Sequence, residues 1–94
     1  AIFCFSDEIA LGCIAGLQNA GITVPDDMSV IGFDDIPFAR YFMPSLTTVA
    51  QPSEAIGRTC ATLLFNLIDG VRPEQNRFVL PHTLIVRSST APPS

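Results

Sequence analysis

The sequence contains no lysine and no tryptophan, and its five positively charged side chains are all arginines. The net charge is −4 at pH 7, and the arginines form no basic stripe of the kind that binds nucleic acid. Any DNA contact of the parent protein is therefore expected upstream of Ala1. The lack of lysine also argues against a phosphorylated receiver domain, because that chemistry needs a lysine beside its carboxylates.

Several catalytic and binding motifs are missing as well. No glycine-rich phosphate loop precedes the first expected helix, since Gly12 and Gly16 fall within it. The only histidine, His82, has no serine or cysteine partner in a recognisable motif. No signal peptide or membrane span is recognisable in the sequence. We therefore expect a chain that is not an enzyme, has no cofactor and does not enter a membrane.

The three cysteines, Cys4, Cys13 and Cys60, are an odd number and lack the spacing of a metal site. Each lies in an apolar stretch, so we predict buried free thiols in a reducing compartment. A cytoplasmic location and the absence of a metal follow from this prediction.

Apolar residues are abundant. They make up 48% of the chain against 15% charged residues, and the mean hydropathy is +0.40. So apolar a chain of 94 residues has too little polar surface to cover itself in water. It also starts without a methionine, inside a stretch that resembles a strand. We expect a fragment of a larger protein.

The most informative stretch runs from Ser29 to Asp35, a short apolar run that ends in two carboxylates. A run of this kind is typical of a buried strand in a parallel sheet. In open α/β sheets, ligands bind outside the carboxyl ends of the strands, which makes Asp34 the first candidate for a ligand contact. A carboxylate accepts charge-assisted hydrogen bonds from two adjacent hydroxyls, which suits a sugar or a ribose.

The N-terminal part predicts a β-α-β unit leading into that strand. Residues 1–5 form a continuous apolar run, consistent with a strand buried on both faces. Ser6 follows as a good N-cap, and Gly21 is well placed to end the helix at the C′ position. The expected fold class is therefore α/β, with a parallel sheet flanked by helices.

The segment from Asp35 to Pro44 is predicted to be a loop or a short helical turn, because Pro37 and Pro44 limit any helix. It carries large side chains, including Tyr41 and Phe42, which favours an interface over a ligand pocket. The remaining expected elements are a strand at 46–50, a helix with Pro52 at its first position that ends at Gly70, strand-like runs at 77–80 and 83–87, and a frayed tail at 88–94.

The residues alone leave alternatives open at the two carboxylate positions. Asp34 is interpreted as a ligand acceptor, with Asp35 capping the following turn. The alternative is that Asp34 and Asp35 are both simply turn-forming residues. A Mg²⁺-dependent phosphotransferase would need further carboxylates, which no comparable strand end supplies. Ser6, with Asp7 beside it, also follows a strand end and is either a ligand contact or only a helix cap.

Four segments carry a resemblance to a known family: Val24–Asp35, Pro44–Pro52, Phe5–Gly12 and Leu84–Thr90. Together they resemble the signature of the lactose-repressor/galactose-repressor family of bacterial transcription regulators, and within it the cytidine-repressor branch. The resemblance extends over nearly the whole chain. It implies the C-terminal portion of a periplasmic-binding-protein-like effector domain, in which a ligand lies between two subdomains.

The resemblance also implies how the chain is divided. Residues 1–50 and 81–94 would belong to the C-terminal subdomain, and residues 51–80 to the N-terminal one. The chain would cross between them at a hinge formed by Ala50, Gln51, Leu80 and Pro81.

The family pattern assigns further roles to particular residues. Asp34 matches the residue that accepts effector hydroxyls, whereas Ser6 stands where relatives often carry a longer polar side chain. The family forms dimers through the first helix and the loop after the acid pair. The corresponding residues here are Leu11, Ala15, Tyr41 and Phe42.

The expected function is therefore the effector-binding and dimerisation part of a transcriptional repressor. Its partners would be a nucleoside or sugar effector, a second copy of the protein, and operator DNA bound through a helix-turn-helix outside this chain. The alternative is a periplasmic sugar-binding protein of a transporter, which shares the fold. A nucleoside hydrolase or phosphotransferase is a third possibility, since enzymes also place paired acids at strand ends.

Overall fold

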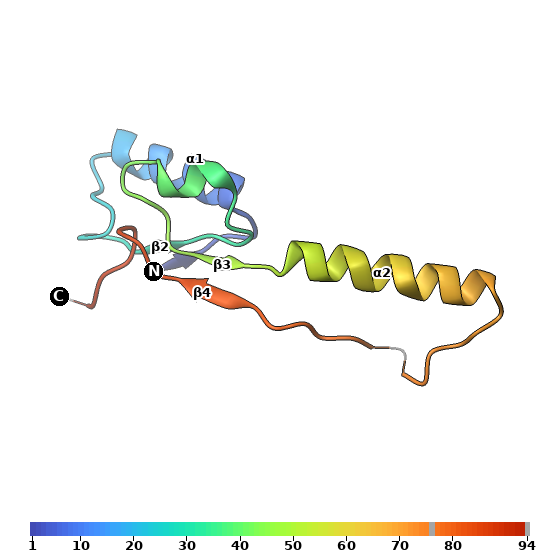
Figure 1. The fold of residues 1–94 in the computed structure, drawn as a ribbon. Coiled ribbons are helices and arrows are strands. Elements are labelled where there is room, and N and C mark those ends of the chain that lie inside the picture. Colours follow the sequence, from blue (N-terminus) through green and yellow to red (C-terminus); the bar gives the residue numbers. More distant parts are fainter. Residues whose placement is uncertain (76, 94) are drawn as a thin grey trace. The chain divides into compact units, whose positions relative to one another are not determined.

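The computed structural model describes residues 1–75 and 77–93 (Figure 1). It divides into two compact units. One consists of Ala1–Gln51 and Thr83–Ser94, and the other of Pro52–His82. Neither of the described α-helices combines the length and apolar character that a bilayer span requires.

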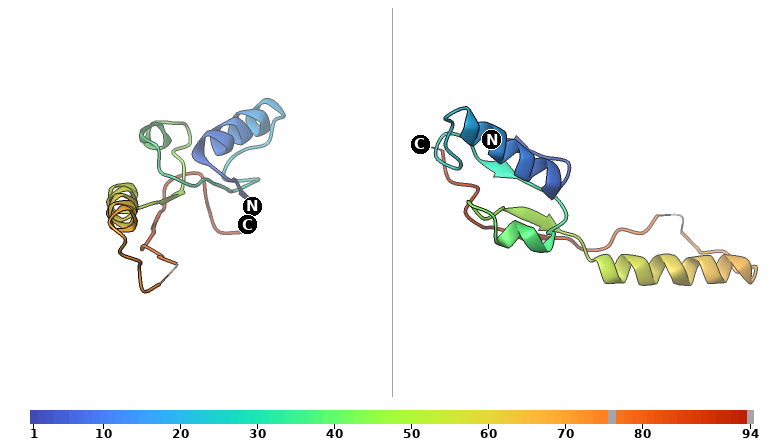
Figure 2. Two further views of the ribbon diagram at one scale, coloured as in Figure 1. Left: turned by 90° about the vertical axis from the view of Figure 1, so that its right-hand side faces the viewer. Right: turned by 90° about the horizontal axis from the view of Figure 1, so that it is seen from above.

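The first unit contains β1 (Ile2–Phe3), α1 (Asp7–Asn19), β2 (Val30–Ile31), the 3₁₀ helix η1 (Pro37–Arg40), β3 (Thr48–Ala50) and β4 (Thr83–Ile85). β1 and β2 pair in parallel, and β3 pairs antiparallel with β4. A parallel bridge between Ile31 and Thr47 links the two pairs. α1 and η1 lie on the same side of these strands (Figures 1 and 2). The unit is thus a small α/β layer structure.

Both ends of α1 are closed as the sequence predicts. Ser6 has extended backbone angles, and its Oγ accepts a 3.2 Å hydrogen bond from the Ile9 N–H. At the other end Gly21 has φ +79°, and the Ile22 N–H donates to the Leu17 carbonyl at 2.9 Å. This is a Schellman motif, which explains why glycine occupies that position.

The buried core of the described residues lies between α1, η1 and the strands, and consists of Cys4, Ala10, Ile14, Val24, Val30, Ala39 and Leu46. Burial raises the pKa of the Cys4 thiol, and Cys13 adds to the effect. The prediction of buried cysteines is confirmed for Cys4. Cys13 is half-buried, and the prediction is wrong for Cys60, which is exposed on the second helix.

The first strand is less enclosed than its apolar sequence predicts. Phe3 is 65% exposed, because β1 has only β2 as a described neighbour. The expectation of a strand buried on both faces is therefore wrong for this chain.

The C-terminal segment is anchored rather than frayed. Ser89 is fully buried, where its Oγ donates to the Val30 carbonyl at 2.6 Å and accepts from the Thr47 N–H at 2.8 Å. Further along, the Ala91 N–H donates to Ser29 Oγ at 3.1 Å. The segment follows β4 and bonds to β2 and to the residues that precede β2 and β3, so the prediction of a frayed tail is wrong as far as Ala91. Ser94 lies outside the described residues.

The second unit is built on α2 (Ser53–Ile68). Pro52 is its N-cap rather than its first residue, so the helix begins one residue later than predicted. Gly70 ends the helix as expected, with φ +83°. No residue of α2 is buried, and the run 77–80, predicted to be strand-like, forms no strand because it pairs with no described neighbour.

Candidate functional site

Asp34 lies just beyond the carboxyl end of β2, where its side chain is exposed. Its φ is +125°, a conformation that L-residues rarely adopt. The Asp34 N–H donates to the Val49 carbonyl at 2.8 Å, and Gln51 Nε2 donates to Asp34 Oδ1 at 3.2 Å. The structure therefore presents a carboxylate to solvent at a strand end, as the sequence predicts, with an amide donor beside it.

The backbone pairing of β1 and β2 continues beyond the two strands. The Cys4 N–H donates to the Ile31 carbonyl at 2.8 Å, and the Asp7 N–H donates to the Phe33 carbonyl at 3.0 Å. Because the strands are parallel, the residues that follow them lie at the same edge of the sheet. Ser6 thus lies at the edge that carries the candidate carboxylate, although its Oγ already caps α1.

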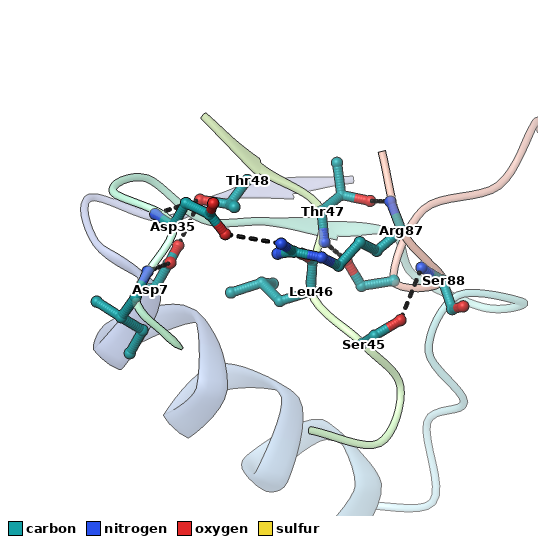
Figure 3. Close-up of polar contacts among 10 residues, drawn as sticks. Asp7, Asp35, Ser45, Leu46, Thr47, Thr48, Arg87 and Ser88 are labelled. Carbon is teal, nitrogen blue, oxygen red and sulfur yellow. Dashed lines mark hydrogen bonds and ion pairs between the residues drawn. The ribbon is translucent and has the colours of Figure 1, made fainter. Parts of the chain in front are cut away.

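Asp35 does not cap the turn that follows it, so that interpretation is wrong. Its Oδ1 forms a 2.8 Å ion pair with Arg87 Nη2, and the two side chains are only 22% and 13% exposed (Figure 3). Arg87 Nη1 also donates to the Leu46 carbonyl at 2.9 Å. A charge-assisted bond to arginine is stronger than a bond to a neutral N–H, which accounts for the different partner.

The turn is held instead by Asp7, which is fully buried at the start of α1. Its Oδ2 accepts from the Ile36 N–H at 2.8 Å, and its Oδ1 accepts from Thr48 Oγ1 at 2.6 Å. Both carboxylate oxygens therefore have donors, as a buried charged group requires. In the sequence, Asp7 is only the neighbour of a possible ligand contact, and its buried role was not predicted.

The residues implied in dimerisation have mixed surroundings. Tyr41 is 74% exposed, and Ala15 is exposed on α1. Leu11 and Phe42 are half-buried and pack against the core. The Phe42 ring also meets Phe38 edge-on at 6.1 Å between centroids. The segment from Asp35 to Pro44, here called the aromatic loop, therefore has one side in the core and one side in solvent.

This segment lies against α1. Gln18 Nε2 on the helix donates to the Met43 carbonyl at 3.2 Å, and Met43 is 83% exposed. The exposed part of the helix and the exposed loop are thus neighbours on one surface.

The residues predicted to form the hinge lie near the boundaries of the two units. Ala50 pairs with Thr83 where β3 and β4 meet those boundaries. Gln51 is the last residue of its segment of the first unit, whereas Leu80 and Pro81 lie in the second. Their role as a hinge stays a prediction.

No three His, Cys, Asp or Glu side chains gather to hold a metal ion within residues 1–75 and 77–93. The chemistry that the site offers is hydrogen bonding. An exposed carboxylate, an amide and a hydroxyl occur at one edge of a parallel α/β sheet, which is the general location of ligand sites in such folds. Fold and site together are those of an α/β domain with a candidate ligand site at one edge of its sheet.

Comparison with known proteins gives the family. Residues 1–90 match the family described as periplasmic binding protein-like domain, and the chain belongs to it. The expected periplasmic-binding-protein-like fold is therefore confirmed.

Similar proteins are transcription regulators. The chain is 42% identical over 89 residues to the HTH-type transcriptional repressor PurR of Vibrio parahaemolyticus, which is 95% of this chain and 27% of that protein. The dimeric Lac repressor is 32% identical with a TM-score of 0.85, over 98% of this chain and 34% of its own. A ribose-bound LacI-family regulator from Enterococcus faecium is 41% identical with a TM-score of 0.79, over the same shares.

The chain thus spans about a quarter to a third of the length of these relatives. They confirm the resemblance to the lactose-repressor/galactose-repressor family in its broad form. These relatives are PurR and LacI-type proteins, so the narrower likeness to the cytidine-repressor branch stays a prediction.

Proposed function

We propose that this chain is the effector-binding and dimerisation part of a bacterial transcriptional repressor, and that Asp34 binds the hydroxyls of a small sugar or nucleoside. The observation that carries the proposal is the exposed Asp34 carboxylate at the carboxyl end of β2, in a chain similar to a ribose-bound regulator. The repressor relatives favour this function over that of a transporter's binding protein or an enzyme.

The chemistry of the proposed site follows from the donors and acceptors at hand. Two carboxylate oxygens accept bonds from adjacent hydroxyls, as on a ribose or a hexose. Gln51, which donates to Asp34 at 3.2 Å, would orient the carboxylate from the next strand end. Ser6 would contribute through a hydroxyl that also caps α1. A nucleoside effector is the narrower proposal, supported by the resemblance to the cytidine-repressor branch.

The proposed dimer interface consists of Leu11 and Ala15 on α1 with Tyr41 and Phe42. Its support is the exposed apolar surface of the aromatic loop, which lies against the helix. A self-complementary contact between two copies would bury it. Operator DNA would bind through a helix-turn-helix outside this chain, in the cytoplasm, where the regulated genes lie.

The two units would belong to two different subdomains of the whole protein, as the resemblance implies. Ala50, Gln51, Leu80 and Pro81 would form the two crossings between them in this chain. Because Gln51 donates to Asp34, effector binding at Asp34 would act directly on one of the proposed hinge residues.

A thermal-shift experiment on the intact protein tests the proposal. Wild type, Asp34→Asn and Asp26→Asn are heated with D-ribose, D-glucose, cytidine or adenosine. Asp26 is exposed, so its variant loses the same charge away from the site. We expect at least one compound to raise the Tm of wild type and of Asp26→Asn, and to raise that of Asp34→Asn much less. Equal shifts in all three proteins, or no shift in wild type, would contradict the proposal.

A further inference from the structure

Asp34 and its neighbour are held in an unusual backbone conformation. The φ angles are +125° at Asp34 and +60° at Asp35, although neither residue is glycine. Such conformations persist only where the surrounding structure fixes them, and they cluster at ligand sites. The residues that fix them therefore control where the Asp34 carboxylate points.

Several of the contacts that fix this backbone lead to one buried residue, Asp7. The Asp7 carboxylate holds the Ile36 N–H at 2.8 Å and the Thr48 hydroxyl at 2.6 Å. The same hydroxyl accepts from the Asp35 N–H at 3.3 Å, and the Asp7 N–H donates to the Phe33 carbonyl at 3.0 Å. The contacts of Asp7 thus secure the backbone immediately before and after Asp34, the proposed ligand-binding residue.

The surroundings enclose this carboxylate tightly. Asp7 and Thr48 are both fully buried. On the side of β2, a Cβ added to Gly32 would overlap Asp7 Oδ1 and come within 2.9 Å of the Leu46 side chain. Glycine at position 32 therefore leaves the room that the carboxylate occupies.

We propose that Asp7 is a positioning residue that holds Asp34 in its binding conformation through the Thr48 hydroxyl and the Ile36 N–H. This inference rests on the proposed function, since it assigns a role within the same effector site. Asp7 does not touch the effector. It selects the one backbone conformation from which the neighbouring carboxylate reaches the ligand.

Loss of the Thr48 hydroxyl would release the strained backbone conformation of Asp34 and Asp35. The apparent affinity then falls by the fraction of molecules that still hold the binding conformation. Strain of the usual size for such residues gives a loss of about 5- to 150-fold, which corresponds to about 1–3 kcal/mol.

The test uses the intact protein and isothermal calorimetry with D-ribose, D-glucose, cytidine and adenosine. Thr48→Val keeps the shape of the side chain and removes the hydroxyl, whereas Thr48→Ser keeps the hydroxyl and removes a buried methyl. Ile14→Val is a matched stability control, because Ile14 is fully buried on α1 and has no part in the network. Asp7→Asn is a further variant, and the Thr48 pair decides alone if it does not fold.

We expect Thr48→Val to weaken effector binding by about 5- to 150-fold. Thr48→Ser should retain affinity to within about threefold, and Ile14→Val should melt earlier with unchanged affinity. In an Asp34→Asn background, Thr48→Val should have little further effect, which a merely structural role would not produce.

The opposite results separate the two proposals. Wild type that binds none of the four compounds refutes the effector site together with the inference built on it. Wild type that binds, with a loss in Asp34→Asn and none in Thr48→Val, overturns only the positioning role. An equal loss from Thr48→Val with and without Asp34 overturns it too.

Discussion

Removing the Asp35–Arg87 ion pair should lower the stability of the fold by an amount that the structure allows us to predict. Replacing Arg87 by methionine removes two charge-assisted bonds, one to Asp35 Oδ1 at 2.8 Å and one to the Leu46 carbonyl at 2.9 Å. It also leaves Asp35 without its partner in a site that is only 22% exposed. Bonds to charged groups contribute about 1.5–3 kcal/mol each, and partial exposure lowers the sum. We expect Arg87→Met to lower the free energy of unfolding by about 2–4 kcal/mol.

The chain offers a matched control for this prediction. Arg58 and Glu54 form an ion pair of the same 2.8 Å length, but their side chains are 75% and 87% exposed. Arg58→Met should therefore cost only about 0.3–0.5 kcal/mol, as for exposed pairs on helices.

Urea denaturation of the intact protein, followed by circular dichroism, measures both changes, and Asp35→Asn completes a double-mutant cycle. We expect the Asp35–Arg87 cycle to give a coupling free energy of about 1–2 kcal/mol. If Arg87→Met costs no more than Arg58→Met, the burial of the pair contributes nothing and the reasoning fails.

Three further predictions concern single positions. Gly32→Ala should lower stability by about 1–3 kcal/mol in urea denaturation, because its Cβ would overlap the buried carboxylate of α1. Gly12→Ala, on α1 and in open space, should instead raise stability by about 0.5–1 kcal/mol. Equal changes in stability from the two glycine substitutions would refute the argument. Ser89→Ala should cost about 2–4 kcal/mol because two buried backbone groups lose their partner, whereas Ser88→Ala on the exposed neighbour should change little. Tyr41→Asp should convert dimers to monomers in analytical ultracentrifugation, and unchanged dimers would move the interface elsewhere.

Features that depend on neighbouring residues were predictable from the sequence. The cap at Ser6 and the glycines that end the two helices act over three to five residues, so their local pattern is sufficient. The position of Asp34 followed from an apolar run that stops abruptly at a carboxylate. The cap of α1, the glycines after both helices and the carboxylate beyond β2 are therefore predictable from local sequence.

Features that need a distant partner were not predictable. Ser89 is buried because it bonds to Val30, 59 positions away, and nothing in the tail itself indicates that contact. Asp35 finds its arginine 52 positions away, which is why the assignment of a turn cap to it was wrong. The run 77–80 has a strand-like composition but no described pairing neighbour. Strand propensity alone does not decide such a segment.

The central claim is that Asp34 binds the adjacent hydroxyls of the effector. It is tested most directly by calorimetric titration of cytidine and 2′-deoxycytidine against wild type and Asp34→Asn of the intact protein. Ribose and 2-deoxyribose replace them if the thermal-shift experiment selects the sugar. In wild type, loss of the 2′-hydroxyl should weaken binding by about 1.5–3 kcal/mol, the contribution of a hydrogen bond to a charged group. Asp34→Asn should weaken cytidine binding by a similar amount, and removing the hydroxyl should then cost little more. If the two losses simply add, Asp34 does not contact that hydroxyl, and the placement of the sugar at this strand end is wrong.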